Sequence, residues 1–164
     1  MDELGSRNWL TKEEATAFIG KNTEYYLDNW KSHPDTFYKG WNWAAAAFRV
    51  EWMAYRKMYL ESVLVLVAVI LLGFAVDAIF SVVRISTPDG FSRFAVQILI
   101  GFIGNGLYRM KAVRILLRTD KMNALQRLSY LEKKGGTSLI GLFVLLGLEI
   151  LIVFLPIAIA SLIS

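Results

Sequence analysis

The chain has 164 residues, 55% of them hydrophobic, and a mean hydropathy of +0.45. A soluble domain of this size cannot bury so large an apolar fraction, so the composition predicts a protein held in a lipid bilayer. Cysteine is absent, which excludes disulfides, thiolate nucleophiles and thiolate metal sites. The formal net charge of +4 is unevenly distributed along the chain, and this distribution bears on membrane orientation.

Residues 1–39 predict a cytoplasmic amphipathic helix. Thr11 and Glu14 have the spacing of a capping box, so the helix is expected to begin there and to continue to Lys31. Pro34, in the sequence Ser-His-Pro-Asp, then ends it.

Residues 40–61 predict an aromatic segment at the membrane interface, where indole and phenol rings place one end in water and the other in lipid. Arg49 and Glu51 are costly at mid-bilayer, which favours an interfacial or shallow re-entrant placement over a full crossing. The alternative is a helix packed on other helices, with its arginines extended toward water. The aromatic residues expected at the interface are Trp41, Trp43, Trp52, Tyr55 and Tyr59.

Residues 62–164 predict an all-α membrane domain. Three apolar stretches are expected to cross the bilayer, at 62–83, 91–108 and 138–163. The first two are joined by a loop with a turn signal at Pro88, and the last two by a polar amphipathic helix over 109–134.

Lysine and arginine are concentrated in two parts of the chain, namely the segment before residue 62 and the connection 109–134. The connection between the first two expected spans and the C-terminal stretch are poor in these residues. Because positive segments stay on the cytoplasmic side, three spans with a cytoplasmic N-terminus account for this alternation.

The segment from Asn42-Trp43-Ala44-Ala45 to Tyr55-Arg56-Lys57-Met58-Tyr59 resembles the signature of the domain-of-unknown-function 2628 family of small bacterial membrane proteins. Similar pieces are Phe18-Ile19-Gly20-Lys21-Asn22, Gly104-Asn105-Gly106-Leu107-Tyr108 and Lys134-Gly135-Gly136-Thr137-Ser138. The chain departs from the family over residues 46–51, where the family usually has an apolar stretch with glycine and proline. The resemblance implies a multi-pass protein of the bacterial cytoplasmic membrane, without an assigned activity.

Three polar residues fall inside the expected spans, where such groups are expensive and tend to be paired or functional. Asp77 is expected to form an ion pair with Arg84 or Arg93 near the outer edge of the membrane, or to extend toward them. For Glu149 the alternatives are a protonated carboxyl that is hydrogen-bonded between helices and an ion or proton site. Asn105 either lines a polar path or lies between two glycines that admit a neighbouring helix, and the second interpretation is favoured.

Several cations flank the expected spans and predict contacts with anionic lipid headgroups. No nucleic-acid partner is expected, because aromatic residues are not interleaved with the basic run that begins at Arg109. The cations expected to contact lipid are Arg56, Lys57, Arg109, Lys111, Arg114 and Arg118.

The sequence has no P-loop, HExxH, GxSxG or dinucleotide-binding motif, and His33 has no partners for a metal site. We therefore expect a protein that is not an enzyme and has no metal or cofactor. Its expected role is that of an accessory, regulatory or immunity-like protein that binds the bilayer and another membrane protein or a second copy of itself. One alternative is an oligomeric small transporter or channel that uses Glu149, Asp77 and Asn105. Another is a membrane enzyme acting on lipid, supported only by the acids.

Overall fold

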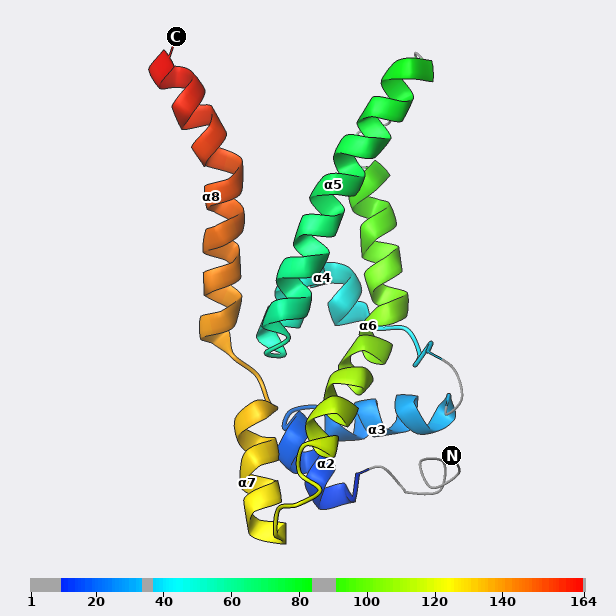
Figure 1. The fold of residues 1–164 in the computed structure, drawn as a ribbon. Coiled ribbons are helices and arrows are strands. Elements are labelled where there is room, and N and C mark those ends of the chain that lie inside the picture. Colours follow the sequence, from blue (N-terminus) through cyan, green and yellow to red (C-terminus); the bar gives the residue numbers. More distant parts are fainter. Residues whose placement is uncertain (1–9, 34–36, 84–90, 164) are drawn as a thin grey trace.

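The computed structural model describes residues 10–33, 37–83 and 91–163, and all of the regular elements in these ranges are helices (Figure 1). The prediction of an all-α protein is confirmed. Pro34 and Pro88, expected to mark a helix end and a turn, lie outside the described residues. The helices are α2 (Lys12–Ile19), α3 (Thr23–Ser32), α4 (Trp43–Tyr55), α5 (Tyr59–Val83), α6 (Phe91–Leu117), α7 (Ala124–Lys134) and α8 (Leu139–Ile163).

The first helix begins as predicted but ends early. Thr11 Oγ1 accepts a hydrogen bond from the Glu14 backbone N–H, and Glu14 Oε2 accepts one from the Thr11 N–H, which completes the capping box. The prediction of one helix as far as Lys31 is wrong, because α2 and α3 are separate. Gly20 and Asn22 between them have φ angles of 67° and 66°, which a helix cannot contain.

Residues 40–61 contain the whole of α4 and the start of α5 rather than a single helix. Asn42 caps α4 by accepting a hydrogen bond from the Ala45 N–H at 2.9 Å. The chain leaves helical geometry at Lys57, where φ is 57°, and Tyr59 already belongs to α5. The aromatic residues expected at the interface therefore do not share one helix.

Two stretches of the described chain are long and apolar enough to cross a membrane. One is Tyr59–Val83, which is α5, and the other is Ala124–Pro156, whose apolar part is α8. The prediction of three such helices is correct for only these two. The expected second span, 91–108, is part of α6, which is less apolar because it contains Gln97, Asn105 and several glycines and continues into a basic stretch.

The polar connection expected as one helix over 109–134 is also divided. Its first part continues α6 to Leu117, and α7 begins only at Ala124. Asn123 starts α7 by exchanging capping-box hydrogen bonds with Gln126. The intervening Arg118–Asn123 stretch turns the chain so that α7 packs against α2.

The helices form a base from which long helices extend (Figure 1). α2, α3, α7 and the C-terminal half of α6 make up the base, while α5, α8 and the N-terminal half of α6 project from the same side of it. α4 lies among these three helices and packs against each of them. α5 and α8 pack mainly on α4 and diverge as they leave the base.

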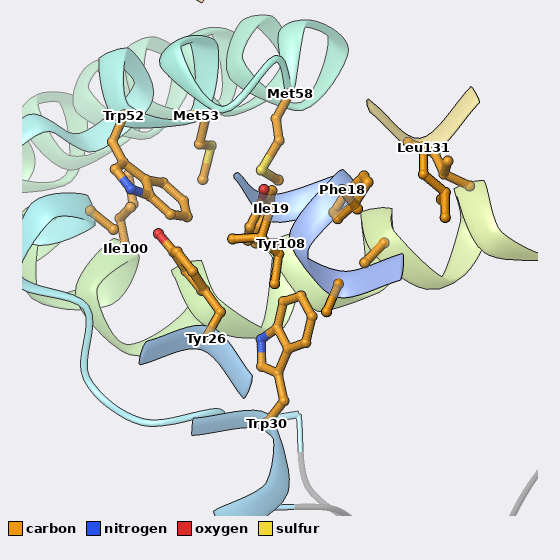
Figure 2. Close-up of a cluster of buried hydrophobic side chains, with 14 of the residues drawn as sticks. Phe18, Ile19, Tyr26, Trp30, Trp52, Met53, Met58, Ile100, Tyr108 and Leu131 are labelled. Atoms are coloured by element: carbon orange, nitrogen blue, oxygen red, sulfur yellow. The ribbon is translucent and has the colours of Figure 1, made fainter. Parts of the chain in front are cut away.

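The core lies where the base meets α4 (Figure 2). Tyr108 of α6 is fully buried there and stacks on Phe18 at a ring-centroid distance of 5.5 Å. The edges of Tyr26 and Trp52 meet the same ring at 4.9 and 6.2 Å. Aromatic pairs of this kind fix the relative positions of α2, α3, α4 and α6.

Candidate functional site

The backbone of α4 is broken at Arg49, which has φ 45° and ψ −118°. Residues other than glycine rarely adopt this backbone geometry. It lowers stability by on the order of 1–3 kcal/mol and persists only where the surrounding structure enforces it. Arg49 Nη2 forms an ion pair with Glu51 Oε1 at 3.3 Å. Arg49 Nε and Glu51 Oε2 are buried without a hydrogen-bond partner in the described chain. Strain and unsatisfied charge therefore coincide at the break.

Glu149 of α8 brings a second carboxyl group to this break. It is half-buried and interacts electrostatically with both Glu51 and Arg49. Two carboxyl groups and one guanidinium give a net charge of −1 when all three are ionised, so the cluster can accept one proton or one monovalent cation. Within the described ranges, His, Asp and Glu side chains do not gather into a metal site.

Asn105 is fully buried and joins α6 to α4 and to the segment before it. Asn42 Nδ2 donates a hydrogen bond to Asn105 Oδ1 at 2.7 Å, and Trp30 Nε1 donates to the Asn105 carbonyl oxygen at 3.2 Å. The interpretation of Asn105 as a residue between closely packed helices agrees with this position better than a polar path does. The Asn105 carboxamide nitrogen donates to Tyr25 Oη at 3.1 Å, Lys39 O at 3.1 Å and Gly40 O at 3.2 Å.

The glycines on either side of Asn105 allow these close contacts. A Cβ atom on Gly104 would lie 2.8 Å from Ala45 Cβ of α4. A Cβ atom on Gly106 would lie 2.3 Å from the Phe37 carbonyl oxygen. Only glycine therefore leaves room for α4 and the segment before it to reach α6.

Arg56 and Lys111, expected to contact lipid, are instead buried. Arg56 donates hydrogen bonds to the carbonyl oxygens of Ile19 at 3.0 Å and Lys21 at 3.1 Å. Lys111 Nζ donates to the Arg56 carbonyl oxygen at 2.7 Å. Burial lowers the pKa of Lys111 to about 8, although the Glu61 carboxylate acts in the opposite direction. Both cations tie the base together and are not available to headgroups.

The other four expected lipid contacts lie at least partly at the surface. Arg114 Nη1 forms an ion pair with Glu61 Oε1 of α5 at 2.9 Å. Lys57 Nζ donates to the Lys133 carbonyl oxygen at 3.2 Å, where the end of α4 meets the end of α7. Arg118 is exposed and Arg109 is half-buried.

The expected interface aromatics have different environments. Trp43 and Tyr59 are 77% and 48% exposed, and Trp41 and Tyr55 are half-buried. Trp52 is only 4% exposed and contributes to the core shown in Figure 2, so it has no surface with which to meet headgroups.

The structure does not gather the three polar residues of the expected spans. Asp77 is exposed on α5, and the side chains of its expected partners, Arg84 and Arg93, lie outside the described part of the chain. Asn105 is enclosed by α4, and Glu149 faces the break in α4. Asn42 and Glu51 also belong to the site, although the sequence marks Asn42 only as part of the family signature and Glu51 only as a charge that is costly at mid-bilayer. Because Asn42 and its partner Asn105 are 63 positions apart, no local pattern indicates their pairing.

Comparison with known proteins matches roughly the first two thirds of the chain to one protein family. The sequence model of the family described as protein of unknown function (DUF2628) matches residues 12–114. The chain belongs to the DUF2628 family. The matched residues of this DUF2628 protein run from α2 to near the end of α6 and include the α4 break and the Asn42–Asn105 pair. α7 and α8, and with them Glu149, lie outside the match.

The search of curated proteins and the search of solved structures return no match to the DUF2628 chain. The family description assigns no activity. Function is therefore argued from the geometry of this chain alone.

Proposed function

We propose that this protein is a non-enzymatic interaction protein of the bacterial cytoplasmic membrane, with an accessory, regulatory or immunity-like role toward another membrane protein. The first support is the exposure of its apolar helices. A soluble protein buries helices as apolar as α5 and α8, whereas here Phe74, Val82 and Phe143 expose 70%, 83% and 66% of their surfaces. A bilayer covers such surfaces.

The direction of the helices supports three crossings with a cytoplasmic base. The Ser138 N–H donates to the Tyr55 carbonyl oxygen at 2.7 Å, so α5 and α8 begin side by side, and they leave the base in the same direction (Figure 1). If both cross the bilayer, the chain between them must cross back, and α6 is the helix that returns to the base. Its polar Asn105 is shielded by α4 from lipid.

The charge distribution supports the orientation. The two cation-rich parts of the sequence pack together in the base, where Arg127 Nη1 of α7 forms an ion pair with Glu14 Oε1 of α2 at 3.1 Å. Positive charge thus collects at the end of the molecule from which α5 and α8 start, which is the cytoplasmic end in this proposal.

Cysteine labelling tests this placement, since the chain has no native cysteine. We expect Thr87→Cys to react with a membrane-impermeant maleimide in intact spheroplasts. Lys121→Cys is expected to react only after the membrane is permeabilised. Labelling of both positions from the same side contradicts the three-crossing arrangement.

The observation that carries the interaction role is the divergence of α5 and α8. They pack mainly on α4 and leave both apolar faces open above it. Lipid can cover these apolar faces but offers no compensating hydrogen-bond donor in the hydrocarbon region, where an exposed carboxylate such as Asp77 is costly. A transmembrane helix of a partner with a polar or basic side chain supplies both an apolar surface for α5 and α8 and a hydrogen-bond donor for Asp77.

Site-specific photo-crosslinking in native membranes tests the partner. A photoreactive residue at Phe74 or Phe143 is expected to give a discrete protein adduct, and an adduct of twice the monomer mass identifies a second copy of the chain. Leu125, which is 82% exposed on α7, is the matched control in the base. Adducts with lipid alone from both helices contradict the interaction role.

The alternative is an oligomeric small transporter or channel, and the Arg49–Glu51–Glu149 cluster favours it. Asn105 does not contribute, because its side chain is fully occupied by hydrogen bonds. Reconstituted protein tests this alternative. If it transports protons or monovalent cations, Glu149→Gln and Glu51→Gln are expected to abolish the flux, and Asp77→Asn is expected to leave it unchanged. Absence of flux in the wild-type protein contradicts the alternative.

A further inference from the structure

An apolar groove of about 300 Å³ lies between the feet of α5 and α8. Its floor is formed by buried side chains of α4, α5 and α8, namely Ala54, Ser62 and Leu145. Its walls are open, since Val63 of α5 and Val144 of α8 are 41% and 67% exposed. The floor of the groove is therefore buried, and its walls are accessible from the side.

The divergence of α5 and α8 creates this groove. At the foot the two helices are held close, because a Cβ atom on Gly141 would lie 2.3 Å from Tyr59 Cε1. Further from the base, α8 separates from its neighbours, and a Cβ atom on Gly147 meets nothing within 4 Å. The groove is therefore closed at the base and open further along the two helices. Its lining offers almost no hydrogen-bond partners apart from the Tyr59 and Ser62 hydroxyl groups.

Lysines adjoin the starts of the two helices, α5 and α8, that form the closed end of the groove. Lys57 lies two positions before the first residue of α5, and Lys133 and Lys134 are the last two residues of α7, just before α8. The Lys57 ammonium donates to the Lys133 backbone carbonyl oxygen, which places Lys57 beside the end of α7, and the Lys134 ammonium lies 5.9 Å from the centre of the Tyr130 ring. Lys133 and Lys134 are exposed. Positive charge at the base and an apolar groove above it match an amphiphile with an anionic head.

We propose that this groove binds an anionic phospholipid of the cytoplasmic leaflet, with part of one acyl chain between α5 and α8 and its phosphate beside Lys57 and Lys134. The proposal rests on the membrane placement given under Proposed function. In that placement the groove opens into the cytoplasmic leaflet, and the lysines lie at headgroup depth. A water-soluble anion has no apolar part to occupy the groove. A lipid without net charge has no net attraction to the lysines.

Native mass spectrometry of the full-length protein tests the proposal, with phosphatidylglycerol and phosphatidylcholine of identical acyl chains as probes. We expect the wild-type protein to retain one phosphatidylglycerol molecule in preference to phosphatidylcholine. Val144→Trp fills the groove with a side chain at an already exposed position and is expected to abolish this retention. Val153→Trp, at a position 58% exposed further along α8, is the matched control and is expected to keep it.

The charged part of the site has its own variants. Lys134→Gln is expected to weaken the preference for phosphatidylglycerol about fivefold, the effect of one cation near a membrane surface. Lys121→Gln, elsewhere in the base, is expected to leave the preference unchanged. Equal retention of the two lipids, or unchanged retention in Val144→Trp, overturns the proposal, as does a photo-crosslink from Val144 to a protein instead of a lipid. Failure of the Thr87 and Lys121 labelling test removes the membrane placement itself, so the two outcomes are distinguishable.

Discussion

Asn42 and Asn105 form a direct side-chain hydrogen bond of 2.7 Å between the first turn of α4 and the middle of α6. Asn42 also caps α4, and Asn105 also bonds the segment that leads into it. One buried pair therefore sets where α4 begins, how it is capped and which part of α6 it meets. The arrangement explains how a helix with a central asparagine can remain in an apolar environment.

Replacement of Asn105 by leucine is expected to lower the free energy of unfolding by about 2–4 kcal/mol. The change leaves Asn42 Nδ2 and the carbonyl oxygens of Lys39 and Gly40 buried without this partner. Thermal unfolding in detergent, followed by tryptophan fluorescence, measures the effect. Asp77→Asn, a polar change at an exposed position of α5, is the control and is expected to be near neutral. Equal stability of the two variants contradicts the assigned role of Asn105.

Stability is expected to rise with pH above about 8 because of Lys111. Burial holds the pKa of Lys111 at about 8, below the ordinary value of 10.5. Between these two values the unfolded chain binds more protons than the folded chain, so deprotonation favours folding. Across the whole interval between the two pKa values, deprotonation of Lys111 raises the free energy of unfolding by ~3 kcal/mol. Lys111→Met is expected to remove this rise, which is read from the difference between the unfolding curves of the two proteins at pH 7.5 and pH 10 (roughly the limits of the window).

Gly106→Ala is expected to destabilise the protein by about 2 kcal/mol or more, because its Cβ would lie 2.3 Å from the Phe37 carbonyl oxygen. Gly73→Ala on α5 is the matched change at a helical glycine with nothing within 4 Å. There alanine is expected to be neutral or to stabilise the helix by up to about 1 kcal/mol. The difference in thermal midpoint between the two variants measures the contact, and similar midpoints count against it.

Asn22→Ala is expected to lower the free energy of unfolding by about 1 kcal/mol. Asn22 has φ 66° and ψ 33°, a left-handed conformation that alanine adopts less readily. Its side chain caps nothing and is exposed, so the change isolates the backbone effect. Asn22→Gly, which adopts this conformation freely, is expected to be at least as stable as the wild type, and a loss of stability in the glycine variant would point to a different cause.

Features set by residues close together in the sequence could be predicted. The Thr11–Glu14 capping box, the apolar helices α5 and α8 and the all-helical class follow from local spacing and composition. Features set by packing could not. Arg49 has a positive φ angle where α4 meets α5, α6 and α8, and no adjoining glycine, proline or asparagine signals this break. The break at Gly20 and Asn22 does carry a local signal, because glycine and asparagine tolerate positive φ, but the prediction of one helix to Lys31 did not use it. Arg56 has the sequence appearance of a surface cation, yet its partners are carbonyl oxygens more than 30 residues earlier in the chain.

The residues of the candidate site also divide into those that the sequence indicates and those that only the fold brings together. Glu149 stands out in the sequence as a lone acid in an apolar stretch, and the structure places it near charged groups. Those groups, Arg49 and Glu51, lie about 100 positions upstream, and only the fold of α4 between α5 and α8 brings them together. The sequence therefore indicates one member of the cluster but not its composition.

The position of α4 has a consequence for biosynthesis. A ribosome releases α4 before any of the three helices that surround it, and it releases α8 after α5 and α6. The break at Arg49 and Glu51 therefore gains its interaction with Glu149 only after α5 and α6 are available to pack on α4.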